Sequence, residues 1–228
     1  MELHGERSLN DSPHPPPWYS QVAVVAPKYF LFKGVVITLF ISLFFSAYFY
    51  LLKNQAYPVT VMPMTWLDRW IEFQPSMMPV YISLWVYVSL PPLFMATRAE
   101  LYAYGGVMAL TCLVGLVIFY FWPTAVPVAD IDWARYPGFE FLKRMDAAGN
   151  ALPSLHVATA VVSGIWLHRL LYLFAAPLWL AGVNAIWCVG IIYSTLATRQ
   201  HVAVDVASGI LLGGMTVYFS LTRRTEST

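Results

Sequence analysis

The sequence predicts an all-α, polytopic membrane protein: a six-transmembrane-helix bundle with an interfacial helix between helices one and two. Of its 228 residues, 59% are hydrophobic and only 11% are charged, against roughly 25% in a typical soluble domain. Long stretches contain no Asp, Glu, Lys or Arg and are continuously apolar, whereas membrane β-strands alternate every second residue. Aromatic residues reach 16%, which suits a protein that meets two lipid–water boundaries.

The same composition excludes two other classes of protein. A soluble domain of this size could not bury so much apolar surface in one core and would need far more surface charge. The formal net charge of +1 lacks the cationic surplus of a nucleic-acid binder, so we expect no nucleic-acid partner. We divide the chain into a polar, Pro-rich N-terminal tail (1–27), a membrane domain (28–222) and a C-terminal tail (223–228).

Charge-free intervals locate the six spans. A transmembrane helix needs about 20 mostly apolar residues. The intervals without charge are 34–52, 73–97, 101–129, 147–168, 170–198 and 206–222. Each has room for one span, and the longest also hold a loop. We therefore predict helices over 29–52, 77–96, 101–122, 153–172, 175–197 and 201–221.

The connection after the first span contains the predicted interfacial helix. Thr65 and Asp68 form a pattern typical of a capping box, which marks a helix start. Trp66, Trp70 and Phe73 follow at helical spacing and form one apolar side. This pattern predicts a short helix that lies in the plane of the membrane surface. It could brace the mouth of the bundle, or it could help to admit a lipid.

Three connections emerge at one end of the predicted bundle, which we call the loop face: 53–76, 123–152 and the junction 198–200. Lys and Arg are divided almost evenly between this face and the opposite one. If the basic residues beside the motifs below serve chemistry, they should be discounted. The positive-inside rule then places the tails and short turns in the cytoplasm. The loop face would be periplasmic or extracytoplasmic.

Three ionisable residues stand at the loop-face ends of apolar helices: His156, His201 and Asp205. His201 and Asp205 are four residues apart, so they share one helical face, about 5–6 Å apart at Cβ. A carboxylate there can hold one imidazole nitrogen and leave the other available for attack. Ionisable groups at membrane depth are costly and usually functional. Beside a cationic loop, this set favours phosphate chemistry.

These residues also have structural interpretations. His156 could hydrogen-bond to a neighbouring helix, and the His201–Asp205 pair could be a structural clasp. The pair could instead form part of a metal site in which Asp205 is the third ligand. However, the chain has no His-Glu-x-x-His pattern, and a zinc site wants a third ligand besides two histidines. We expect no metal and no cofactor.

Two motifs carry a resemblance to a known family: Pro153-Ser154-Leu155-His156, and the run 194–205 that ends in His201-Val202-Ala203-Val204-Asp205. Together, at these helix ends, they resemble the type 2 phosphatidic acid phosphatase superfamily. The Pro-Ser-Leu-His form is most similar to the branch of inositol phosphorylceramide synthases and their bacterial relatives. The segments 65–75 and 123–127 resemble that branch too. The similarity covers about 29–221, nearly the whole chain.

The resemblance implies a six-helix bundle that breaks or transfers phosphoesters without a metal ion. His201 would attack phosphorus and carry the transferred group as a phosphohistidine, while Asp205 would orient His201 and stabilise its charge. His156 would protonate the leaving oxygen and then activate the acceptor, water or a hydroxyl.

The sequence departs from the phosphatase branch in its cations. That branch has Lys-x6-Arg-Pro before its Pro-Ser-Gly-His motif and Ser-Arg before its last histidine. Here the first pattern is absent, and Ser194-Thr195 stands in place of the second. The candidate phosphate-binding residues are therefore Arg144, Arg199, Lys143, Arg135 and Ser154. Arginine ranks above lysine because its guanidinium can clamp two phosphate oxygens. Arg199 could instead mark the membrane boundary, and Ser154 could merely cap its helix.

The leading hypothesis is an integral membrane lipid phosphatase or phosphotransferase that acts on a lipid phosphate or phosphodiester. We expect a membrane lipid as substrate and a location in a bacterial inner membrane, with the site facing the periplasm, and we assign no oligomeric state. The alternative is a transporter or lipid-binding membrane protein without catalysis. Against it, no inverted repeat is visible, and the ionisable residues cluster at one face instead of the midplane. A degenerate family member kept as a scaffold is a third possibility.

Overall fold

The structure is a computed structural model and describes residues 16–139 and 149–225. Its helices are α1 (Trp18–Val25), α2 (Phe30–Lys53), α3 (Trp66–Trp70), α4 (Met78–Ile82), α5 (Leu84–Tyr87), α6 (Leu90–Leu93), α7 (Arg98–Phe121), α9 (Leu155–Leu173), α10 (Leu178–Ala197) and α11 (Ala203–Thr225), with 3-10 turns η1 (Pro75–Met77) and η2 (Trp133–Arg135). Two short strands, β1 (Thr60–Val61) and β2 (Thr124–Ala125), complete it. The prediction of a mostly helical chain is confirmed.

Five helical stretches in the described part of the chain are long and apolar enough to cross a membrane. They are Phe30–Lys53, Pro75–Leu93, Arg98–Phe121, Leu178–Ala197 and Ala203–Ser220. Each corresponds to a predicted span, so the chain has the character of an integral membrane protein. The remaining predicted span forms α9, but His156, His168 and Arg169 make it less apolar. Its crossing of the membrane stays a prediction.

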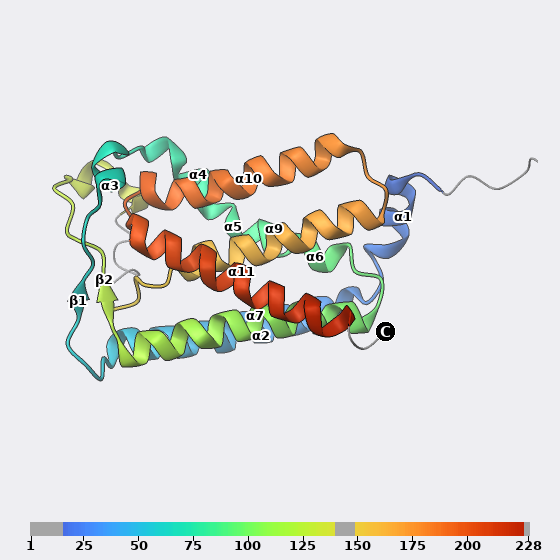
Figure 1. The fold of residues 1–228 in the computed structure, drawn as a ribbon, viewed down its shortest axis with the longest axis horizontal. Coiled ribbons are helices and arrows are strands. Elements are labelled where there is room, and N and C mark those ends of the chain that lie inside the picture. The colour runs from blue at the N-terminus through green and yellow to red at the C-terminus, as the bar shows by residue number, and fades with distance from the viewer. Residues whose placement is uncertain (1–15, 140–148, 226–228) are drawn as a thin grey trace, which may run out of the picture.

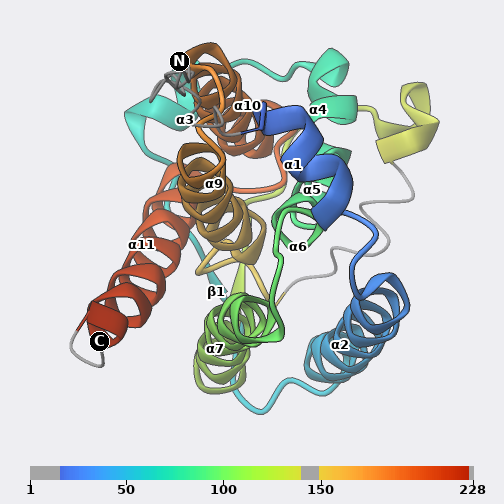
Figure 2. The same ribbon diagram turned by 90° about the vertical axis from the view of Figure 1, so that its right-hand side faces the viewer.

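Helix α9 lies at the centre of the bundle. It packs against α11, α10 and α7, and the short helices α5 and α6 also contact it (Figure 2). Its small residues Ala158 and Ala160 are fully buried, as is Val162. Helix α2 lies farther out and packs mainly on α7. The loop face, with α3, β1 and β2, is at one end of the bundle, and α1 is at the other (Figure 1).

The second predicted span is divided instead of forming one regular helix over 77–96. It consists of η1, α4, α5 and α6 in succession. Pro79 lies in the first turn of α4, and Pro91 and Pro92 lie in the first turn of α6. They separate these helices from the turns before them, because proline lacks the N–H that a helix interior needs. Pro92 leaves the carbonyl of Val88 without its helical donor, and the Tyr104 hydroxyl donates to that carbonyl instead, at 2.8 Å. The divided segment packs on α10 through α4 and on α9 through α5 and α6.

Helices α9 and α11 approach closely at two glycines of α11. A Cβ on Gly209 would lie 2.5 Å from the carbonyl oxygen of Ser154, and a Cβ on Gly213 would lie 2.5 Å from that of Ala158. Small residues four apart allow this kind of contact between helices. The contact brings the start of α9, which carries His156, against the first turns of α11.

We expect Gly209→Ala to lower the free energy of unfolding by about 1–3 kcal/mol, because the new methyl group overpacks a backbone contact. Gly214→Ala is the matched control, since a Cβ on Gly214 meets nothing within 4 Å and alanine favours helix over glycine by about 1 kcal/mol. Thermal unfolding of both purified variants in detergent measures the difference. Equal stabilities would contradict the close packing of α9 on α11.

The strands were not predicted, because two-residue strands leave no periodic pattern in a sequence. They pair in parallel, with Thr60 opposite Thr124. The N–H of Met62 donates to the carbonyl of Ala125 at 2.9 Å. Thr124 is fully buried, and its hydroxyl accepts the N–H of Leu152 at 2.7 Å. The strand pairing and the Thr124–Leu152 hydrogen bond together hold the segment before α9 against the loop face.

Candidate active site

The first turn of α9 carries His156. The hydroxyl of Ser154 accepts the N–H of Val157 at 3.2 Å and so caps the helix. The His156 ring stacks on Tyr81, with centroids 4.1 Å apart and an interplanar angle of 11°. The backbone of Tyr81 also accepts a hydrogen bond from this imidazole. Its Nε2 atom is buried and has no hydrogen-bond partner among the described residues, so this nitrogen is available to a ligand.

His201 and Asp205 form a pair where α11 begins. Nδ1 of His201 lies 3.5 Å from Oδ2 of Asp205. Asp205 is fully buried, while the His201 side chain keeps 11% of its surface exposed. Oδ2 of Asp205 also accepts the N–H of Val202 at 3.1 Å. A carboxylate held at this helix start is favoured by the helix dipole.

The two histidine-bearing segments are joined through backbone. The N–H of Ser154 donates to the carbonyl of Asp205 at 3.0 Å. His156 and His201 line the same cavity and are close enough to interact electrostatically. The structure therefore brings the three predicted catalytic residues together at the loop-face end of the bundle.

Asp68 of α3 holds the start of α11 in place. Its Oδ1 accepts the N–H of Ala203 at 2.7 Å, and its Oδ2 accepts both the N–H and the hydroxyl of Thr65, each at 2.7 Å. The predicted helix start at Thr65 is thus confirmed, while a position of α3 at the membrane surface stays a prediction. Arg199 reinforces the contact, donating to the carbonyls of Asp68 at 2.6 Å and Ile71 at 2.8 Å.

We expect Asp68→Asn to weaken both stability and turnover. One carboxylate oxygen becomes an NH2 group that faces an N–H donor, which costs about 1–3 kcal/mol for the unsatisfied group, and the start of α11 loses its anchor beside His201. Glu72→Gln makes the same chemical change on an exposed side chain of the same segment and should leave both properties unchanged. Thermal unfolding and turnover, measured for both variants, test this; wild-type behaviour of Asp68→Asn would refute the anchoring role.

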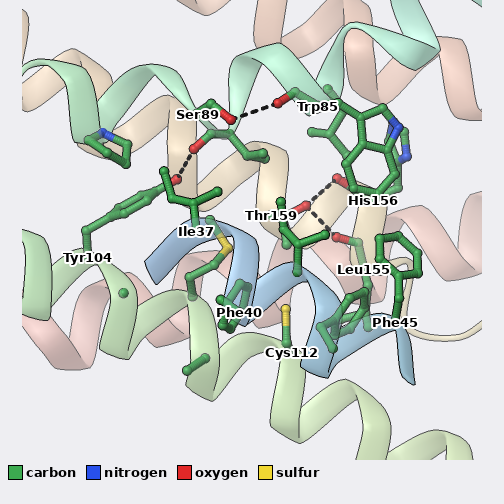
Figure 3. A pocket seen from close by; sticks show the side chains of 18 of the residues that line it. Ile37, Phe40, Phe45, Trp85, Ser89, Tyr104, Cys112, Leu155, His156 and Thr159 are labelled. Atoms are coloured by element: carbon green, nitrogen blue, oxygen red, sulfur yellow. Dashed lines mark hydrogen bonds between the residues drawn. The ribbon is translucent and has the colours of Figure 1, made fainter. Parts of the chain in front are cut away.

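A large apolar cavity, which we call the apolar chamber, reaches the histidines. It has a volume of about 540 Å³ and is bounded by α2, the α4–α6 segment, α7 and the start of α9. Figure 3 shows Phe40 and Phe45 of α2, Trp85 of α5 and Cys112 of α7 around this space, with His156 at one side. Its volume is within the range of about 300–1,000 Å³ of small-molecule sites.

A second cavity, which we call the polar pocket after the amide side chains of Asn150 and Gln200 in its lining, also borders His201. Its volume is about 220 Å³, and its lining includes Asn150, Gln200 and the segment 124–129. His201, Tyr48 and Asn150 border both cavities. His201 therefore borders both the apolar chamber and a second space that contains amide side chains.

The five predicted phosphate-binding residues differ in their positions and contacts. Lys143 and Arg144 lie outside the described residues. Arg135 is exposed and pairs with Asp132 at 3.0 Å. Arg199 binds carbonyls of the α3 segment, and the Ser154 hydroxyl caps α9. A phosphate contact stays a prediction for each of the five.

Several residues at the site were missed by the sequence analysis. Tyr81 stacks on His156 from a segment that reads only as apolar. Gln200 is 2% exposed, its Oε1 has no partner among the described residues, and it borders the polar pocket with Asn150. The position of Gln200 directly before His201 could have indicated that it lies at the site. Asn150 could not be found, because nothing in its sequence context points to a site.

Within 16–139 and 149–225, no group of three or more His, Cys, Asp or Glu side chains is placed to hold one ion. The independence from metal remains a prediction.

The architecture defines the class of protein: a helical integral membrane protein with a histidine–aspartate centre at one end of an apolar chamber. The family model of the PAP2 superfamily matches residues 96–228, more than half of the chain, and the chain belongs to that superfamily. Its members are generally phosphoesterases, which supports an enzyme. Neither the search of curated proteins nor the search of solved structures returned a match.

Proposed function

We propose that the protein is a metal-independent phosphohydrolase or phosphotransferase that acts on a lipid phosphate or phosphodiester through a phosphohistidine at His201. The position of His201 carries this proposal, because it borders both the apolar chamber and the polar pocket. A lipid with its chains in the chamber and its headgroup in the pocket would have its phosphorus beside this imidazole.

In the first step of the proposed reaction, Nε2 of His201 attacks phosphorus. The N–P bond forms as the bond from phosphorus to the leaving oxygen breaks, and protonated His156 gives its Nε2 proton to that oxygen. Asp205 stabilises the positive charge that develops on His201. Its 3.5 Å contact with Nδ1 is expected to shorten then, since such contacts are often long before substrate binds.

The second step regenerates the protein. Nε2 of His156 takes the proton of water or of a hydroxyl as its oxygen attacks phosphorus, and the N–P bond of His201 breaks. Water gives a hydrolase, and a lipid or headgroup hydroxyl gives a transferase. The Pro-Ser-Leu-His form and the missing cations favour the finer resemblance to the inositol phosphorylceramide synthase branch, and thus headgroup transfer.

The proposal includes a position in the membrane. Helix α9 would be the sixth span, since α7, α10 and α11 surround it. Helix α3 would lie at the surface on the loop face, with Trp66 and Trp70 both about three-quarters exposed (75% and 76%) toward the headgroups. The lipid would enter between α2 and the α4–α6 segment, where Phe45 contacts Trp85 with ring centroids 5.4 Å apart. Once the basic residues beside the motifs are discounted, the positive-inside rule favours a periplasmic position of this face in a bacterial inner membrane.

A lipid-panel assay tests the proposed function. The purified protein, in chelator, is given lipid phosphates and phosphodiesters with and without an inositol or choline headgroup donor, and products are read by mass spectrometry. Free phosphate identifies a hydrolase, and a new headgroup lipid identifies a transferase. The transporter alternative predicts flux of a lipid or solute in liposomes without any change in its covalent structure.

A further inference from the structure

The apolar chamber contains a cation that the proposed chemistry does not use. Lys33 lines the chamber and is only 4% exposed. Its Nζ has no hydrogen-bond partner among the described residues. A buried ammonium without a partner is strongly unfavourable, and lysines near the ends of membrane helices normally extend to water. A buried Nζ without a partner, on a residue that lines a cavity, therefore indicates a binding site for an anion.

Lys33 is far from the histidine–aspartate centre. It lies in the first turn of α2, while Tyr48, which borders both cavities, lies 15 residues later on the same helix. The usual helical rise makes this separation about 22 Å. The chamber thus has a cation at the end nearest α1 and the site at the loop-face end.

No described residue at the Lys33 end neutralises this charge. The described lining of the chamber contains no Asp, Glu or Arg. Glu100, at the start of α7, accepts the N–H groups of Ala96 and Thr97. Arg98 adds a second cation at this end, since its guanidinium lies 5.6 Å from the ring centroid of Phe32, which also lines the chamber. An anionic group would complement this end of the chamber.

We infer that Lys33 binds the anionic headgroup of a single-chain amphiphile, a carboxylate or a phosphate, whose hydrocarbon chain points toward His156 and takes the place of a substrate chain in the apolar chamber. The headgroup would come from the membrane leaflet opposite the proposed reaction. The ammonium supplies the charge-assisted hydrogen bonds, and the aromatic and aliphatic lining accepts the chain. The site differs in position and ligand orientation from the proposed reaction site.

Binding measurements on the full-length protein test this site. Calorimetry in neutral detergent compares palmitate, 1-hexadecanol with the same chain but no charge, and inorganic phosphate with charge but no chain. Palmitate should bind at least about tenfold more tightly than 1-hexadecanol. Lys33→Met should remove that advantage, while Lys28→Met, which neutralises an exposed lysine before the same helix, should keep it.

Each other result overturns the inference. Palmitate affinity that survives Lys33→Met would show that the ammonium does not hold the headgroup. Inorganic phosphate that binds as tightly as palmitate would show a free-anion site. Unfolding temperatures establish that the variants fold, and removal of an unpaired buried charge should raise that of Lys33→Met without ligand; a decrease would also contradict an unpartnered Nζ.

A photoreactive palmitate shows which way the bound chain points in the apolar chamber. With a diazirine near its terminal methyl group, it should label the loop-face end of the chamber, around Leu155 and Phe49. Label around Phe32 and Leu101 would mean that the headgroup lies at the histidines and would overturn the inference. All these readouts report binding, so they stand whether or not the protein turns over phosphoesters.

Discussion

Replacement of His201 by glutamine should reduce phosphoester turnover by at least about 10³-fold, because the nucleophile is lost and no other group replaces it. Glutamine keeps a polar side chain of similar size at a position that is mostly buried, so the bundle should fold as the wild type does. Turnover is measured on the lipid that the panel identifies, and thermal unfolding is measured on the same preparation.

His168→Gln is the matched control for this experiment. It makes the same chemical change on the same kind of residue, but His168 is exposed and lies twelve positions beyond His156 on α9, about 18 Å away along the helix. Its turnover should equal that of the wild type. Comparable activity in His201→Gln and His168→Gln would remove His201 from the mechanism.

Replacement of His156 by glutamine should reduce turnover by about 10²–10⁴-fold, the usual contribution of general acid–base catalysis. Part of this loss comes from the missing proton for the leaving oxygen. A substrate with a nitrophenol leaving group needs no such proton, so its transfer to His201 should slow much less in His156→Gln than transfer from a lipid substrate does.

The two variants are therefore distinguishable. The nitrophenyl substrate should restore much of the first step in His156→Gln, seen as a burst of nitrophenol, and should restore none of it in His201→Gln. An equal loss on both substrates in His156→Gln would contradict its role as the acid. His156 would then have a packing role instead, and its stack on Tyr81 is the structural basis for that role.

The five long apolar helical stretches were predictable because each lies in an interval with few or no charged residues. The predicted span over 29–52 appears as α2, Phe30–Lys53, and the one over 101–122 as α7, Arg98–Phe121. Helix α7 starts earlier than predicted, because Thr97 and Glu100 form a capping box across the charged turn. The prolines of the second span indicate that its helix is interrupted, whereas its hydrophobicity alone does not indicate an interruption.

The relation between His201 and Asp205 was predictable because it is local to one helix turn. The position of His156 beside them depends on the contact of α9 with α11, which Gly209 permits through a close backbone approach. The spacing of Gly209 and Gly213 is visible in the sequence, but the partner helix is not. Only the family resemblance of the two motifs indicated that α9 is the helix that packs on α11.

Contacts between distant segments were beyond the sequence. Thr65 and Asp68 indicated a helix start, yet nothing showed that the same carboxylate also accepts the N–H of Ala203. Arg199 was assigned to phosphate by its charge and its proximity to His201. Its backbone has φ 57° in the turn that ends α10, and its guanidinium binds carbonyls of the α3 segment.

The most direct test of the account is to trap the covalent intermediate. The protein is mixed with a lipid substrate labelled at phosphorus and quenched in alkali, where phosphohistidine survives, and the modified peptide is sequenced by mass spectrometry. The account predicts label on His201, absent from His201→Gln and present in His168→Gln. Sustained turnover with no label on His201, or label on another residue, would contradict it.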